Sequence, residues 1–139
     1  MSAPNVRQVR LRWSGEGLAF EGGPEGGVQI GVDSDGASGQ TPMQLLLMSL
    51  AGCMGVDVLM ILQKSRVPVE TLEVEVTGVR AETPPKRYVS VELVYRITGP
   101  SQDDQAKLDR AIELSRDRYC SVLHTLDSAL DVQIRVQRG

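Results

Sequence analysis

The spacing of hydrophobic and polar residues changes several times along the chain, and each spacing predicts a different element. Over residues 9–13, apolar side chains alternate with arginines, which is typical of a half-buried β-strand. Two further short strands are expected over 18–21 and 28–32, because glycine-rich turns precede both. Residues 33–40 are polar and predict a loop.

A long apolar segment then begins with a clear helix start. Thr41 and Gln44 have the spacing of a capping box, and Pro42 suits the first helical position. The helix is expected to end near Ser65, because Pro68 follows. At a rise of 1.5 Å per residue it would be roughly 36 Å long, enough to cross a domain of this size.

The second half of the chain returns to alternating strands. Two strands are expected over 72–76 and 89–97, and a last one over 132–136. Two helices are expected within 101–129, with a break near 119–121 that leaves the second helix short. Because strands follow one another in runs, this order predicts an α+β protein with a mainly antiparallel sheet.

The composition is that of an ordinary globular protein. The 139 residues suit a single domain over 1–139, and 41% hydrophobic and 24% charged residues are usual values. A net charge of −3 offers no basic surface, so we expect no nucleic-acid partner. Residues 45–62 approach the length of a membrane span but contain Asp57 and two glycines, so we expect a buried helix and no membrane contact. The N-terminal residues contain no apolar segment typical of a secretory signal, so we expect a cytoplasmic protein with reduced thiols.

Cys53 lies in the middle of the long helix, close to Gly52 and Gly55. Two interpretations are open: a small buried side chain at a tight helix crossing, or a reactive thiol that another group approaches closely. Asp57 lies one turn further along the same face. Because its negative charge would raise the pKa of the thiol, a reactive thiolate here needs a cation from elsewhere.

A second thiol, Cys120, lies at the expected junction of two helices, where free backbone amides would lower its pKa. It is distant from Cys53 in sequence, but thiols from distant elements can act as an attacking and a resolving pair. His124 follows on the same helical face, and the three residues would make a Cys₂His metal set. Since the sequence shows no fourth ligand, we expect no metal and no cofactor.

Around both cysteines the sequence resembles the OsmC/Ohr family of osmotically inducible and organic hydroperoxide resistance proteins. The resemblance rests on TPMQLL (41–46), AGC (51–53), DV (57–58), VTGVR (76–80) with Pro85, AI (111–112) and YCSV (119–122). It covers nearly the whole chain. It implies an OsmC-like fold with a long buried central helix, in an intertwined homodimer with the active site at the subunit interface.

The same resemblance implies a thiol peroxidase for organic hydroperoxides. Cys53 would attack the peroxide and become a sulfenic acid, and Cys120 would then close a disulfide that an external dithiol reductant reopens. An apolar pocket would favour alkyl peroxides over hydrogen peroxide. The candidate pocket residues are Met43, Gln44, Met54 and His124.

Two departures separate this chain from Ohr enzymes proper and place it nearer the OsmC-like branch. Met43 stands where those enzymes have a glutamate, and the first hairpin turn, 14–17, lacks their arginine. Arg80 is the candidate replacement cation, and Asp57 the carboxylate that would hold it. Each also has a plain structural explanation: a solvated arginine at a strand end, and a buried carboxylate satisfied by a hydroxyl or backbone group.

These departures leave a second function open. The chain would then be a non-catalytic OsmC-like dimer that binds a small apolar or lipid-like ligand at its subunit interface. Oxidation of Cys53 by an organic peroxide separates the two functions.

Overall fold

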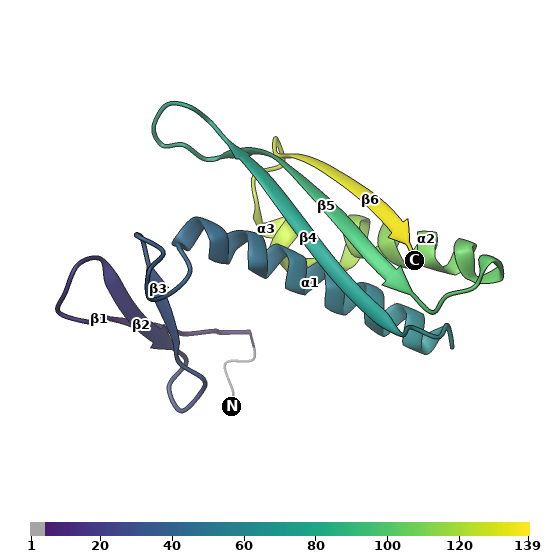
Figure 1. Cartoon of the computed structure of the whole chain (residues 1–139), viewed down its shortest axis with the longest axis horizontal. Coiled ribbons are helices and arrows are strands. Elements are labelled where there is room, and N and C mark those ends of the chain that lie inside the picture. The colour runs from purple at the N-terminus through teal and green to yellow at the C-terminus, as the bar shows by residue number, and fades with distance from the viewer. Residues whose placement is uncertain (1–4) are drawn as a thin grey trace. The chain divides into compact units, whose positions relative to one another are not determined.

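The computed structural model describes residues 5–139, and its elements follow the order expected from the sequence: three strands, a long helix, two strands, helices and a last strand (Figure 1). The chain divides into two compact units, one ending at Leu46 and the other beginning at Leu47. The boundary falls within the long helix.

The first unit contains a three-stranded antiparallel sheet of β1 (Arg10–Trp13), β2 (Ala19–Gly23) and β3 (Ile30–Asp33). All four residues of β1 are exposed in the single chain. The expected alternation of a buried and a solvated face is therefore wrong for this strand. Leu11 and Trp13 are 52% and 55% exposed, so the apolar side chains of β1 have no core within their own unit.

The helix α1 (Pro42–Lys64) begins and ends where the sequence predicts. The Gln44 amide donates to Thr41 Oγ1 at 3.1 Å, and the Thr41 amide donates to Gln44 Oε1 at 2.9 Å, which is a reciprocal capping box. Within residues 5–139, α1 is the one helix long and apolar enough to cross a membrane, with a mean hydropathy of 2.3. A core helix meets the same criterion.

The second unit contains a separate three-stranded sheet of β4 (Thr71–Arg80), β5 (Tyr88–Thr98) and β6 (Asp131–Arg138). β4 and β5 form the expected antiparallel hairpin. β6 instead pairs with β5 in parallel, so the mainly antiparallel prediction fails at this one edge. A parallel neighbour needs a long crossover connection, and the chain between Gly99 and Leu130 supplies it.

This crossover consists of short helical pieces. They are η1 (Gln102–Asp104), α2 (Gln105–Leu114), the π-helical turn η2 (Ser115–Tyr119) and α3 (Ser121–Thr125). The break near 119–121 is confirmed. The last helix ends at Thr125 rather than near 129, because Leu126 already has an extended backbone, with ψ of 166°.

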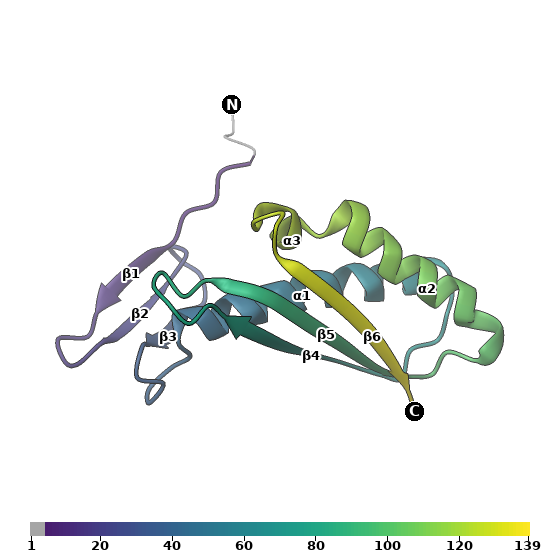
Figure 2. The same cartoon turned by 90° about the horizontal axis from the view of Figure 1, so that it is seen from above.

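The core of the second unit lies against one face of this sheet, where α1 and α2 run beside one another (Figure 2). Every fourth residue of one α1 stripe is buried: Leu50, Met54, Val58 and Leu62. Alternate residues of β5 and the inner residues of α2 complete this core: Val91, Leu93, Tyr95, Ile97, Leu108, Ala111 and Ile112. The opposite side of α1 is also apolar, yet Met48, Val56 and Met60 are more than half exposed in the single chain.

Leu62→Ala should lower the free energy of unfolding by about 2–5 kcal/mol, because it leaves a cavity in a fully buried stripe. Urea titration of the purified protein measures the change. Gln63→Ala, on the exposed neighbouring position, is the matched control and should change stability by less than about 0.5 kcal/mol. Equal effects of both substitutions would show that this stripe is not the core.

Candidate functional site

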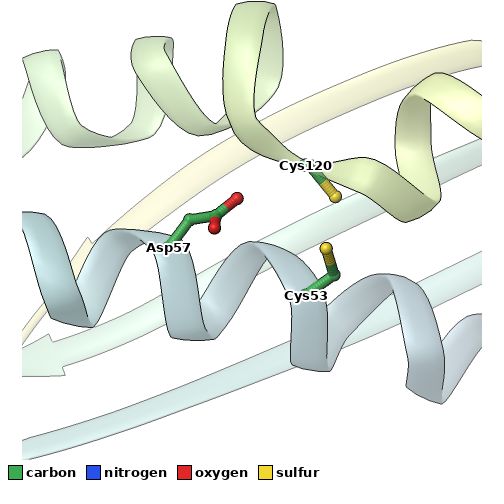
Figure 3. Close-up of side chains that lie close together, drawn as sticks. All are labelled: Cys53, Asp57 and Cys120. Carbon is green, nitrogen blue, oxygen red and sulfur yellow. The ribbon is translucent and has the colours of Figure 1, made fainter. Parts of the chain in front are cut away.

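Two cysteines and an aspartate come together inside the second unit. Cys53 lies in the middle of α1, Asp57 one turn further along it, and Cys120 just before α3. The two sulfurs and a carboxylate oxygen all lie within 4.8 Å of one another. Figure 3 shows the Cys53 and Cys120 side chains directed toward each other across the space between the helices. Both cysteines are free thiols.

The π-helical turn η2 places Cys120 over α1. The Cys120 amide donates to the Ser115 carbonyl at 2.9 Å, the five-residue spacing of a π-helix. Cys120 itself is extended, with φ of −73° and ψ of 101°, and its sulfur accepts the Leu123 amide at 3.4 Å as the N-cap of α3. Turns of this kind occur frequently at functional sites.

Ser115 holds the Asp57 carboxylate. Its hydroxyl, which is fully buried, donates to Asp57 Oδ2 at 3.0 Å. No ion pair within residues 5–139 includes Asp57. The plainer of the two sequence interpretations, a carboxylate satisfied by a hydroxyl, therefore describes Asp57 in this chain. The sequence offered one signal for Ser115, a polar residue on the apolar face of a helix.

The two thiols differ in their access to solvent. Burial is the largest influence on Cys120 and raises the pKa of its thiol to about 12, while the amide of Leu123 opposes this and Cys53 and Asp57 add to it. The sequence-based expectation of a lowered pKa is therefore wrong in direction, because desolvation outweighs one amide hydrogen bond. Cys53 is only half-buried. A molecule from solvent would thus meet Cys53 first, while Cys120 stays protonated at neutral pH.

Tyr95, on β5, belongs to the same neighbourhood, and sequence reasoning missed it. Burial raises the pKa of its phenol, and the charges of Cys120, Asp57 and Cys53 raise it further. Its hydroxyl is buried without a hydrogen-bond partner in the part of the chain that the structure describes. An unpaired buried hydroxyl costs about 1–3 kcal/mol. In the sequence Tyr95 is one of several alternating strand residues, so no pattern distinguished it.

Arg80 lies at the far end of β4, where its Nε donates to the Lys86 carbonyl at 2.7 Å. The middle of α1 packs against β4 at Val74, whose Cγ2 is 3.4 Å from the position of a Cβ on Gly55. Arg80 is further along the strand, by roughly 20 Å at about 3.3 Å per residue. The second unit therefore does not bring its own Arg80 to the cysteines.

The two glycines near Cys53, Gly52 and Gly55, lie on different faces of α1. Gly55 faces β4, where a Cβ would be 3.4 Å from Val74 Cγ2, an ordinary van der Waals contact. Gly52 is exposed, and a Cβ there would have nothing within 4 Å. It lies on the same outward stripe as Met48, Val56 and Met60.

A cavity of about 570 Å³ opens beside Asp57. Its walls are Asp57, Met60, Ile61, Lys64, Ser65, Leu114 and Tyr119.

None of the four residues that the sequence proposed as pocket residues lines this cavity. Met54 is fully buried in the core, Gln44 caps α1, and Met43 is half-buried in the first turn of that helix. His124 is exposed, with its Nε2 3.1 Å from the Arg116 carbonyl oxygen.

The possible metal ligands differ from the set that the sequence suggested. Within residues 5–139, the side chains close enough to share an ion are Cys53, Asp57 and Cys120. His124 is not among them. The aspartate takes the place of the histidine because the π-helical turn directs Cys120 toward α1, whereas His124 contacts the turn itself.

The α+β fold, with one thiol on its long helix and a second thiol opposite it, can be compared with those of known proteins. The family described as OsmC-like protein matches residues 34–135. Protein YhfA of Escherichia coli K12 is 38% identical over 126 residues, which are 90% of this chain and 92% of that protein. The chain therefore belongs to the OsmC-like protein family, as the sequence resemblance predicted.

Solved structures show the same fold. A hypothetical protein from Aquifex aeolicus VF5 superposes with a TM-score of 0.84 at 32% identity, covering 97% of each chain. The organic hydroperoxide resistance protein OhrB of Bacillus subtilis superposes with a TM-score of 0.65 at 18% identity, covering 97% of this chain and 100% of that one. The second similarity concerns the fold alone.

Ser115→Ala should lower the free energy of unfolding by about 1–3 kcal/mol, because the substitution leaves the Asp57 carboxylate without its buried hydroxyl donor. Thermal and urea unfolding of reduced protein measure this effect. Ser121→Ala, at an exposed serine of the same crossover, is the control and should be nearly neutral. A neutral Ser115→Ala variant would show that this hydrogen bond does not stabilise the site.

Proposed function

We propose that this protein is a thiol peroxidase that reduces organic hydroperoxides in the cytoplasm, where thiols stay reduced. The observation that supports this most strongly is the pair of free sulfurs, from distant elements, within 4.8 Å of one another. A disulfide has an S–S length of about 2.05 Å, so small side-chain movements would join them. A structural relative, the Bacillus subtilis protein, is named for organic hydroperoxide resistance.

The first step belongs to Cys53, the more accessible thiol. Its thiolate attacks one oxygen of the hydroperoxide, so that an S–O bond forms and the O–O bond breaks. The leaving alkoxide takes a proton and departs as an alcohol, and Cys53 becomes a sulfenic acid. The sulfur has lost two electrons, and the peroxide bond has gained them.

The second step belongs to Cys120. Its sulfur attacks the sulfur of the Cys53 sulfenic acid, the S–S bond forms, and the hydroxyl leaves as water with the Cys120 proton. The high pKa of Cys120 suits this order, because a protonated, buried thiol does not compete for the peroxide. An external dithiol then returns both cysteines to thiols by exchange.

A homodimer is part of this proposal. The outward stripe of α1 and the strands of the first unit expose large apolar side chains: Met48, Val56, Met60, Leu11, Trp13 and Ile30. Apolar surfaces of this kind mark contacts with another chain. In such a dimer the second copy would cover α1 and bring further groups near the cysteines.

The peroxide reaction is tested by mixing reduced protein with cumene hydroperoxide, hydrogen peroxide or buffer and measuring its intact mass. The organic peroxide should remove about 2 Da within minutes, the change for one disulfide per chain, and should act faster than hydrogen peroxide. Cys120→Ser should instead gain about 16 Da, because the Cys53 sulfenic acid then has no partner. Cys53→Ser, the control, should not react.

Failure of Cys53 to oxidise within minutes would contradict the peroxidase and favour the second function, an OsmC-like dimer that binds an apolar ligand. The cavity beside Asp57, with walls from Met60, Ile61 and Leu114, supports that alternative. Apolar ligands would then protect the fold against heat without oxidising either thiol.

The dimer is tested by light scattering on a sizing column. The wild type should have twice the chain mass of 15.1 kDa, and Val56→Asp should reduce it to one chain mass, because a carboxylate would be buried unpaired in the interface. Asp103→Ser, on the exposed η1, is the control and should stay dimeric. A monomeric wild type would contradict the homodimer.

A further inference from the structure

The group of Cys53, Asp57 and Cys120 combines three side chains that can each carry a negative charge. Their ligand atoms lie within 4.8 Å of one another, and the one hydrogen bond described for the Asp57 carboxylate comes from the neutral hydroxyl of Ser115. No ion pair within the described residues includes Asp57. Two sulfurs and one carboxylate oxygen facing a common point form a donor set for a thiophilic cation, which displaces the thiol protons when it binds.

The spacing suits a small divalent ion. Zinc binds thiolate sulfur at about 2.3 Å and carboxylate oxygen at about 2.0–2.2 Å, so that tetrahedral ligand atoms are roughly 3.5–3.8 Å apart. The distances between the three atoms therefore need to shorten by at most about 1.3 Å for the atoms to share an ion. Two sulfurs and one oxygen also fit zinc better than magnesium or calcium, which take oxygen ligands.

Two neighbours supply what metal ligands usually need around them. Ser115 fixes the orientation of the Asp57 carboxylate through the 3.0 Å hydrogen bond, as outer partners of metal-bound carboxylates do. Burial, and after it the charges of all three groups, raise the pKa of the Tyr95 phenol, whose buried hydroxyl has no hydrogen-bond partner among the described residues. It is therefore a free donor for a water in the fourth position or for a coordinated sulfur.

We propose that the reduced protein binds one Zn²⁺ ion through Cys53 Sγ, Cys120 Sγ and the Asp57 carboxylate. Two Zn–S bonds and one Zn–O bond form, the two thiol protons leave to solvent, and no atom changes its oxidation state. One of the three ligands, Asp57, lines the cavity of about 570 Å³. Because coordination engages both sulfurs, the bound ion protects the dithiol from peroxide. The binding itself does not depend on the peroxidase proposal.

Cobalt is the probe for this site, because Co²⁺ adopts the same tetrahedral geometry and absorbs visible light. Reduced, metal-free protein is titrated with Co²⁺ without oxygen. We expect saturation at one ion per chain, a sulfur-to-cobalt charge-transfer band and the strong visible bands of tetrahedral cobalt. Added Zn²⁺ should displace the cobalt and bleach these bands. Proton release in weak buffer should accompany binding of either ion.

Four variants assign the ligands, each checked for folding by circular dichroism. Cys53→Ser and Cys120→Ser should each lose the two-thiolate spectrum, and Asp57→Asn should weaken binding by roughly tenfold or more. His124→Gln is the matched control and should bind as the wild type does. Tyr95→Phe tests the outer partner and should weaken binding by about tenfold while leaving the reduced, metal-free fold at least as stable.

Absence of the charge-transfer band in reduced wild type would overturn the metal site, as would an unchanged spectrum in either serine variant. Loss of binding in His124→Gln with full affinity in Asp57→Asn would overturn the role of Asp57. The peroxide assay is run on metal-free protein, so a failed peroxidase and a failed metal site give different results. Zn²⁺ that leaves the oxidation rate of Cys53 unchanged would overturn the protection.

Discussion

The burial of a single stripe of α1 is the constraint on which the second unit depends. Leu50, Met54, Val58 and Leu62 recur every fourth residue and pack against β5 and α2. This stripe sets the rotation of the helix about its axis. Cys53 and Asp57, themselves one turn apart, lie beside the stripe rather than within it, and so reach the gap under the crossover. The packing of this stripe therefore places the thiol of Cys53 and the carboxylate of Asp57 next to Cys120.

Local signals made much of the fold predictable. The capping box of Thr41 and Gln44 and the proline beyond Ser65 define α1 within a residue or two, because helix ends depend on neighbours in sequence. The alternation in the second half likewise located β4, β5 and β6. The direction of β6 was not predictable, because a strand pattern is the same in both directions and the pairing partner is chosen by the crossover.

The three side chains at the centre of the site were predictable from the sequence, and the groups that surround them were not. The sequence pointed to Cys53, Asp57 and Cys120, which the structure brings together. It could not show the π-helical turn, because the extra residue in that turn leaves no periodic mark over so short a segment. The contact between Ser115 and Asp57 and the unpaired hydroxyl of Tyr95 depend on that turn and on tertiary packing. The pKa of Cys120 depends on its burial for the same reason.

The three-stranded sheet of the first unit has little packing of its own to stabilise it. Among its described residues, 5–46, the buried ones are Gly22 and Asp33, and no apolar side chain there is fully buried. A small sheet without a packed face is marginally stable in water. Contacts from the proposed second copy would supply the missing packing for these strands. If a second copy provides them, folding and association share one free energy, and the stability of each chain rises with protein concentration.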